Sequence, residues 1–394
     1  MALLTFVTIF CRSICMLKQS SSRPSRLRGT FALTLLAAAI GTATPALADP
    51  EVVRSVKVDE RVYEIAFNPA TQAVYAAVTG LGDDNKQQVT PGIVVLDAST
   101  LEQKNKIETG DVTPFGLGIN TKTQKIYAVD TRKGVVGVYD LKSGKEVAVI
   151  ENSGDESNHL RQAVVDEKAN KIYISAFGGM VRDGKKGPDS AVWVIDGATD
   201  KLESVIVSPV QSAAGLALDA DNKRLYVADL NSSTIAEIDL STQKVLRTFD
   251  SVITEKDANP EPFDTINLEI DTKNGQLYAI NQKSGGVSLI DLKSGKITRT
   301  VKTGDGALSA RLHPQSGDLY VANRNDGTVS VVDADTHYVT AHLFTGVRPQ
   351  TLAIDPKTGQ VYVSNKSKGK GRQAPEDAPV PVEAAGNTIT LITP

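Results

Sequence analysis

Arginine, histidine and aromatic residues stand at matching places along this 394-residue sequence, each just before an expected β-strand. Guanidinium groups bind phosphates through paired hydrogen bonds, and aromatic rings stack on nucleobases. The combination indicates a surface for an extended anionic ligand such as single-stranded DNA. The alternative is that the rings only pack between sheets and the arginines are only solvated. The candidates are Arg61, Tyr63, Phe115, His159, Arg161, Phe263 and Arg348.

Two further ligand-binding candidates lie elsewhere in the chain. Trp193, the only tryptophan, stands at a strand position where the other repeats have smaller residues, beside an inserted loop. It either contacts the ligand or covers that loop. The insertion 366–386 begins with basic residues at Lys366 and ends Pro-rich and acidic, a composition typical of a flexible loop. Its basic residues either meet phosphates or form a solvated segment.

Catalytic and cofactor motifs are missing from the sequence. It has no nucleophile elbow, phosphate-binding loop or paired zinc ligands. The four histidines fall in different turns and strands of the repeat, so they cannot converge on one metal ion. They are His159, His313, His337 and His342. We therefore expect a non-enzymatic protein with no catalytic residue, no cofactor and no metal.

A sevenfold repeat sets the positions of these residues. An apolar-Tyr pair recurs seven times, 42 to 53 residues apart. Seven residues before each tyrosine stands an Asn, Asp or His, which predicts two strands joined by a tight turn. The tyrosines are Tyr75, Tyr127, Tyr173, Tyr226, Tyr278, Tyr320 and Tyr362, and the turn residues are Asn68, Asn120, Asp166, Asp219, Asp271, His313 and Asp355.

Each unit continues with two more strands. Six units have an Asp-x-x-Ser/Thr turn after the third strand, as at Asp97 and Asp333. Four antiparallel strands per unit, repeated seven times, predict an all-β fold, a seven-bladed β-propeller. The seventh unit lacks a fourth strand, and "VVRSVKV" from Val52 to Val58 matches the fourth strand "ITRTVKT" from Ile297 to Thr303. We expect this N-terminal strand to complete blade seven and close the ring.

All irregular spacing falls on one side of the expected ring. The turn between first and second strands is constant, whereas the second-to-third connections are longer in blades one, three and seven. In such blades these connections open on the same side as the links between blades. We call that side the loop face and the opposite side the uniform face. Loops on a rigid scaffold commonly carry binding sites, and the candidate residues lie at this mouth of the central channel.

The repeats also carry a family resemblance. The segments "VYVSNKSKG", "LYVANRNDGTVSVVD" and "RPQTLAIDPKTGQVYVSN" resemble the YVTN-type repeats of YncE-like periplasmic proteins, which are seven-bladed β-propellers. The resemblance covers all seven blades. It implies an exported protein without known enzymatic activity, and one member of the family binds single-stranded DNA. Family resemblance of this kind supports fold better than function.

Carboxylates and amides near the channel leave one enzyme hypothesis open. A propeller lactonase that holds a divalent ion could use Glu64, Asn267 and Glu269 as ligands. Glu269 and Arg311 occupy equivalent positions in neighbouring first strands where other blades have Ala, Gly or Val. We expect these two to form a structural ion pair, with a functional role as the alternative.

The first 48 residues have the pattern of a cleaved signal peptide. Basic residues precede the apolar stretch Phe31 to Ile40, and Ala46-Leu47-Ala48 forms a cleavage site. We expect a periplasmic protein that begins at Asp49, has no membrane span and is a monomer. The remaining single domain, 49–394, keeps 38 of the 43 basic residues against 46 acidic ones, a net charge of about −8. Both cysteines lie in the leader, so the mature chain needs no disulfide.

The sequence thus favours an exported binding protein that uses its loop face, with single-stranded DNA or another anion as ligand. A scaffold that binds a periplasmic or envelope protein is the alternative, and a metal-dependent lactonase is the third reading. An overall negative charge argues against a broadly basic nucleic-acid-binding surface, so any affinity for DNA must be local.

Overall fold

The computed structural model describes residues 49–394 except for 59–60, 83, 85, 153–158, 179–180, 183–184, 208, 254–263, 371–373, 376 and 382. The expected signal peptide and Phe263 therefore lie outside the described residues. All regular structure in the described part is β-strand. No helix there is long and apolar enough to cross a membrane.

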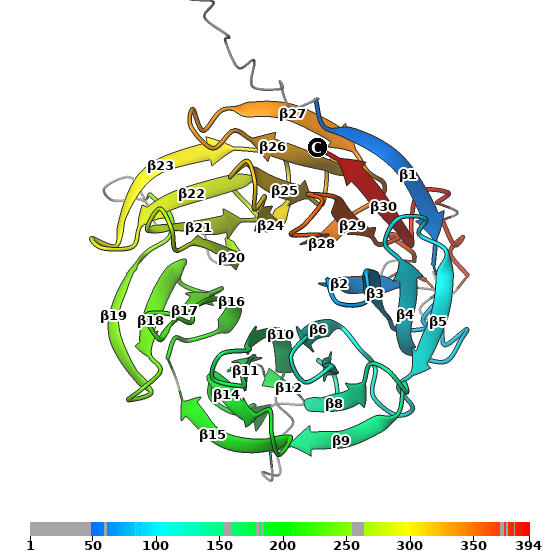
Figure 1. The fold of residues 1–394 in the computed structure, drawn as a ribbon, viewed down its shortest axis with the longest axis horizontal. Helices are drawn as coiled ribbons and strands as arrows, with labels where there is room; N and C mark the ends of the chain where they lie inside the picture. Colours follow the sequence, from blue (N-terminus) through cyan, green and yellow to red (C-terminus); the bar gives the residue numbers. More distant parts are fainter. Residues whose placement is uncertain are drawn as a thin grey trace, which may run out of the picture. The chain divides into compact units, whose positions relative to one another are not determined.

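Seven four-stranded antiparallel sheets follow one another around a central axis, as the repeat predicts (Figure 1). Blade one comprises β2 (Val62–Asn68), β3 (Ala73–Val78), β4 (Gly92–Asp97) and β5 (Gln103–Glu108). Blade two comprises β6 (Gly116–Asn120), β7 (Lys125–Asp130), β8 (Val135–Asp140) and β9 (Glu146–Glu151). Blade three comprises β10 (His159–Asp166), β11 (Lys171–Phe177), β14 (Ala191–Asp196) and β15 (Lys201–Val207), with the small hairpin β12 (Val181–Arg182) and β13 (Lys185–Lys186) between its second and third strands. Blade four comprises β16 (Ala213–Asp219), β17 (Arg224–Asp229), β18 (Thr234–Asp239) and β19 (Lys244–Asp250).

The remaining blades complete the ring. Blade five comprises β20 (Thr265–Asp271), β21 (Gln276–Asn281), β22 (Gly286–Asp291) and β23 (Lys296–Lys302). Blade six comprises β24 (Ala307–Leu312), β25 (Leu319–Asn323), β26 (Thr328–Val332) and β27 (Val339–Phe344). Blade seven comprises β28 (Pro349–Ile354), β29 (Val361–Asn365), β30 (Thr388–Thr393) and β1 (Glu51–Lys57).

The N-terminal strand closes the ring, as the match with the fourth strands predicts. β1 pairs with β30 so that Val52 faces Ile392 and Val56 faces Ile389. The Val58 backbone N–H donates to the carbonyl of Asn387 at 3.0 Å. The innermost strands of blades seven and one, β28 and β2, contact each other like those of every other neighbouring pair. Figure 1 shows β1 and β30, from opposite ends of the chain, side by side.

The turns of the uniform face are formed by the residues that the repeat singles out. The Asp97 carboxylate accepts hydrogen bonds from the Ser99 hydroxyl at 2.7 Å and from the backbone N–H groups of Ser99 and Thr100, each at 3.0 Å, and these bonds hold its pKa low, at about 2. In blade six, His313 stands at the position of the usual Asx residue and accepts the turn hydrogen bond, which runs from the Ser316 backbone N–H to His313 Nδ1 at 3.1 Å. A histidine therefore replaces Asx without loss of the turn.

Each recurring tyrosine packs in the core between its own blade and the next. Two of them also form hydrogen bonds across the joint. Buried Tyr127 of blade two donates from its hydroxyl to Asp200 of blade three at 3.0 Å, and Tyr362 of blade seven donates to the carbonyl of Ala98 in blade one at 3.1 Å, across the closing joint. Burial raises the pKa of these hydroxyls. The repeat thus carries its inter-blade contact within its own sequence.

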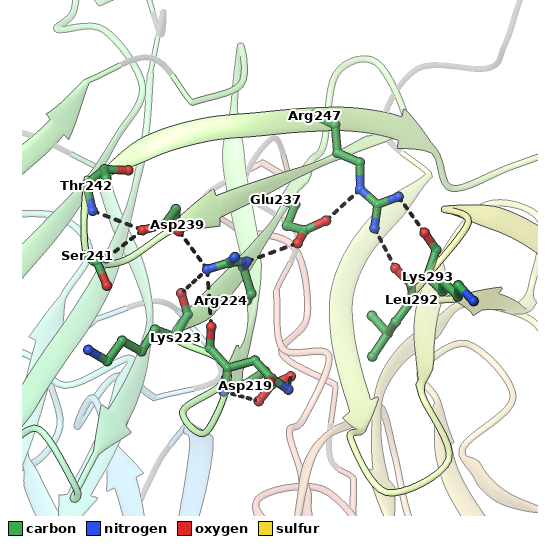
Figure 2. A network of polar contacts seen from close by, with 11 residues as sticks. Asp219, Lys223, Arg224, Glu237, Asp239, Ser241, Thr242, Arg247, Leu292 and Lys293 are labelled. Carbon is green, nitrogen blue, oxygen red and sulfur yellow. Dashed lines mark hydrogen bonds and ion pairs between the residues drawn. The ribbon is translucent and has the colours of Figure 1, made fainter.

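Charged side chains add a second kind of link between blades four and five (Figure 2). Glu237 accepts from Arg247 at 2.6 Å and lies 3.3 Å from Arg224. Arg247 then reaches the next blade, where its guanidinium donates to the carbonyls of Leu292 and Lys293. One arginine on the outermost strand β19 therefore binds both blades.

Candidate functional site

A cavity of about 580 Å³ opens at the loop-face end of the central channel. Residues at or just before the innermost strands of all seven blades contribute to its wall. Among the described residues that line it, five are cationic and one is a carboxylate: Arg132, Arg161, Arg311, Arg324 and Lys366 against Glu64. The cavity therefore carries positive charge in a protein whose net charge is negative.

A local irregularity of the innermost strands builds this wall. In six blades the register between the first and second strands shifts near the mouth, for example between Val62 and Ile65 and between Leu160 and Ala163. A β-bulge lets two consecutive residues point to the same side of a strand. Two rings of side chains therefore face the channel.

We call these rings the upper ring, five residues before the turn residue of each blade, and the lower ring, one residue further along. The upper ring is nearer the mouth and holds Tyr63, Phe115, Arg161, Ala214, Ile266, Leu308 and Gln350. The lower ring holds Glu64, Gly116, Gln162, Gly215, Asn267, Ser309 and Thr351.

The lower ring joins neighbouring blades. Glu64 accepts from the backbone N–H of Leu117 at 3.1 Å, and Gln162 accepts from Leu216 at 2.7 Å. Across the closing joint, Thr351 accepts from the N–H of Ile65 at 3.0 Å. The side chains of Asn267 and Ser309 donate to carbonyls of the next blade. At the two glycines a Cβ would come within 2.5 Å of the next blade's backbone, so only glycine permits that approach.

The aromatic residues of the upper ring are held together and covered by cations. Tyr63 and Phe115 meet edge to face with centroids 4.8 Å apart. The Lys366 ammonium group lies 3.9 Å from the centre of the Tyr63 ring and donates to the Tyr63 hydroxyl at 2.5 Å. The guanidinium group of Arg132 lies 5.4 Å from the centre of the Phe115 ring. One face of each ring is thus occupied by a positive charge.

Two arginines at the mouth, Arg161 and Arg324, are partly buried on the cavity wall. Burial lowers the pKa of Arg161, and burial together with the nearby charge of Arg348 lowers that of Arg324. Within the part of the chain that the structure describes, neither side chain has a hydrogen bond or an ion pair. A partly buried charge without a counter-ion is less stable than a paired one, so an anion that enters the cavity would stabilise both groups.

The channel floor carries a charge network. Arg311 donates to Glu269 at 3.1 Å, and the Leu312 N–H donates to the same carboxylate at 3.2 Å. The structure confirms the ion pair predicted for these residues. Burial raises the pKa of Glu64 to about 7, although the charge of Arg311 and the bond from Leu117 act in the opposite direction. Glu64 and Arg311 also border a second cavity of about 450 Å³ at the uniform face.

Comparison with known proteins places this architecture in a family. A family model described as the SMP-30/Gluconolactonase/LRE-like region matches residues 146–325. The protein named Uncharacterized protein YncE from Salmonella typhi is 31% identical over 280 residues, which cover 69% of this chain and 72% of that protein. The protein of the same name from Escherichia coli K12 is 30% identical over 285 residues, covering 70% of this chain and 74% of that protein. The chain belongs to the YncE family.

The structure gathers five of the nine residues that the sequence proposed for a ligand on this YncE-family chain. Tyr63, Phe115, His159, Arg161 and Lys366 all line the loop-face cavity. Arg348 lies beside it, where its backbone carbonyl accepts from the N–H of Lys366 at 3.1 Å. Arg61 is only 7% exposed and is not part of the cavity wall, and its carbonyl accepts from Thr79. Phe263 lies outside the described residues.

Trp193 is not a ligand-binding residue of the loop face, contrary to one of the two predictions for it. Its side chain is 0% exposed and packs in the core between blades two and three, among residues such as Val138 and Leu160. It sits opposite Ile174 and Val205 in the sheet, so its strand position turns it toward the neighbouring blade. Its large indole ring fills the interface between blades two and three, at a position where the other blades have smaller residues.

The ligands proposed for a divalent ion do not fit a metal centre. Glu64 and Asn267 bind backbone groups of the next blade, and Glu269 is paired with Arg311. Among the residues described, no group of three or more His, Cys, Asp or Glu side chains could hold a metal. In this YncE-family channel, the carboxylate and amide groups of Glu64, Asn267 and Glu269 are therefore already engaged in contacts between blades.

Sequence reasoning missed Arg132 and Arg324. Arg324 and Lys366 both stand four residues after the repeated tyrosine, and Arg132 stands five after it. These places follow the second strand, where the chain turns across the mouth. Aligning this turn across the seven units, as was done for the residues before the first strands, would have shown a second set of cations at the loop face.

Proposed function

We propose that this YncE-family protein is a binding protein that holds an anionic ligand at the loop-face end of its central channel. The observation that carries the proposal is a pair of partly buried guanidinium groups on the cavity wall, those of Arg161 and Arg324, which have no ion pair among the described residues. Such groups are stabilised by phosphate or carboxylate oxygens, which accept paired hydrogen bonds. Arg132 and Lys366 on the same wall add to the attraction.

Single-stranded DNA is the polymeric ligand that we propose for this mouth. Its phosphates would lie on the arginines, and the affinity would be modest and dependent on salt because the rest of the protein is acidic. Base stacking must use the uncovered faces of Tyr63 and Phe115, or displace Lys366 and Arg132 from the covered ones. Phosphate contacts therefore contribute more than stacking does in this proposal.

A lactone hydrolase is a second candidate, favoured by the match of residues 146–325 to a family description that includes gluconolactonase. The channel supports it less well than binding, since the proposed metal ligands are used for blade contacts. Incubation of the protein with gluconolactone and Ca²⁺, Mg²⁺ or Zn²⁺, with pH monitored, tests it directly. Hydrolysis above the spontaneous rate that Glu64→Gln abolishes would favour the enzyme.

The binding proposal is tested by fluorescence anisotropy with a labelled oligonucleotide across a salt series. Arg161→Gln and Arg324→Gln should each weaken binding about tenfold or more, because each removes a partly buried charge that contacts the ligand. Lys273→Gln, an exposed change on the uniform face, is the matched control and should have no effect.

Two results would count against the proposal. Equal losses from the control and the mouth variants would place any binding elsewhere on the protein. Absence of binding at low salt, for the oligonucleotide and for small phosphates alike, would reject the anion site and favour a protein-binding scaffold.

A further inference from the structure

One side of the loop-face cavity is apolar. Ala214, Ile266 and Leu308 line it and form a small cluster with Leu230, against which Phe177 packs. These four aliphatic residues are between 1% and 9% exposed. The cluster is separate from the seven larger clusters between and within the blades, and Ala214, Ile266 and Leu308 turn their remaining exposed surface to the cavity.

The apolar side lies between cationic groups. Ala214, Ile266 and Leu308 come from the upper ring of blades four, five and six. Arg161 belongs to neighbouring blade three, and Arg324 follows the second strand of blade six. Arg132 of blade two and Lys366 of blade seven continue the cationic part around the rest of the mouth. The cavity therefore has an apolar side that is flanked by cations.

A ligand with only one kind of group would match only one side of the cavity. An inorganic anion would balance the guanidinium groups but would not contact the small apolar surface that Ile266 and Leu308 present to the cavity. A purely apolar molecule would cover that surface but would leave Arg161 and Arg324 without a counter-ion, which is costly at a partly buried site. A ligand that carries both kinds of group satisfies both sides at once. The cavity volume of about 580 Å³ falls within the range of about 300–1,000 Å³ that is usual for small-molecule sites.

We infer that the loop-face cavity binds an amphipathic anion, with one phosphate or carboxylate head on the arginine side and an aliphatic or aromatic body against Ala214, Ile266 and Leu308. The inference rests on the proposed function and names the chemical class of its ligand. A long polyanion lying flat over the mouth would reach the cations only. The apolar side therefore distinguishes a small ligand, or the end of a larger one, from the middle of a polymer.

The experiment compares hexyl phosphate with its two halves, inorganic phosphate and hexanol, by isothermal titration calorimetry on the intact protein at low salt. Burial of several methylene groups should make hexyl phosphate bind at least about tenfold tighter than phosphate. Arg324→Gln should weaken both phosphates. Ile266→Thr and Leu308→Thr should weaken hexyl phosphate several-fold and leave inorganic phosphate unchanged.

Leu312→Thr is the matched control, because Leu312 lines the cavity at the opposite end of the channel. Thermal unfolding of each variant checks that it is folded, and the comparison of the three ligands on the unaltered protein decides the matter if a threonine variant is not. Equal affinity for hexyl phosphate and phosphate overturns the inference and leaves the anion site intact. Failure of both phosphates and of the oligonucleotide to bind overturns the proposed function itself.

Discussion

Replacement of Glu64 by glutamine should stabilise the protein at neutral and alkaline pH. Glu64 stands in the lower ring, lines both cavities and accepts a hydrogen bond from the Leu117 N–H. Glutamine keeps an oxygen that can accept the same bond. The change therefore removes a charge while it preserves the blade contact.

The magnitude follows from the pKa of Glu64, which burial raises from 4.5 to about 7. The folded state then binds a proton that the unfolded state has lost, so stability falls as pH rises from about 4.5 to about 7. A shift of this size corresponds to about 3 kcal/mol. Because Glu64 also faces water in the channel, we discount this and expect a gain of about 1–2 kcal/mol for Glu64→Gln above pH 7.

Chemical unfolding of wild type and Glu64→Gln at pH 4.5, 6 and 8 measures the effect. The two proteins should be close in stability at pH 4.5, where Glu64 is protonated in the folded wild type and about half protonated in the unfolded chain, and should diverge up to pH 8. Glu108→Gln, an exposed change on β5, serves as the control. The variant should also bind phosphates more tightly at pH 8, since a negative charge has left the cavity. A constant difference across the pH range, or a loss of stability at pH 8, would refute the reasoning.

Three other expectations can be checked separately. Deletion of Asp49–Val58 should expose the edge of blade seven and lower the free energy of unfolding by a few kcal/mol, and a truncated protein as stable as the intact one would show that β1 does not close the ring. Arg247→Ala should cost about 1–3 kcal/mol because it breaks charged bonds to two blades and leaves Glu237 with one partner fewer, whereas the exposed-pair control Lys104→Ala should cost almost nothing, as urea unfolding can measure. We propose that the protein is exported, and mass spectrometry of the chain isolated from the periplasm should find a mature start at Asp49, while a retained apolar leader would contradict cleavage.

The fold was predictable from the sequence because each blade is specified locally. The seven-residue spacing from a turn residue to a tyrosine fixes a hairpin, and the Asp-x-x-Ser/Thr turn fixes the next one. The closing strand was predictable for the same reason, since Val52 to Val58 carries the pattern of an outermost strand. Even His313, which breaks the Asx pattern, keeps the turn because its ring nitrogen accepts the bond that a carboxylate would accept.

The site was only partly predictable because it depends on which way each residue faces. Alignment before the first strands found Tyr63 and Arg161, which point into the channel. The sequence also placed Glu64 near the channel, but it did not foresee the β-bulge that lets consecutive residues such as Arg161 and Gln162 both face inward, because a bulge is an irregularity of pairing between strands. For Trp193 the sequence showed an unusual residue type but not the side of the sheet, and the side decides between a ligand contact and a core contact.

The two rings separate stability from recognition in this channel. Polar side chains of the lower ring bind the backbone of the next blade, so a change such as Thr351→Val would remove a contact that holds the ring closed. In the upper ring, Arg161, Ile266 and Leu308 offer their side chains to the cavity and make no such blade-to-blade hydrogen bond among the described residues. A scaffold with this division can change the chemistry of its mouth without loosening its blades. The apolar side and Arg161 belong to the upper ring, and Arg132, Arg324 and Lys366 belong to the turns after the second strands. The identity of the ligand is therefore encoded outside the lower ring.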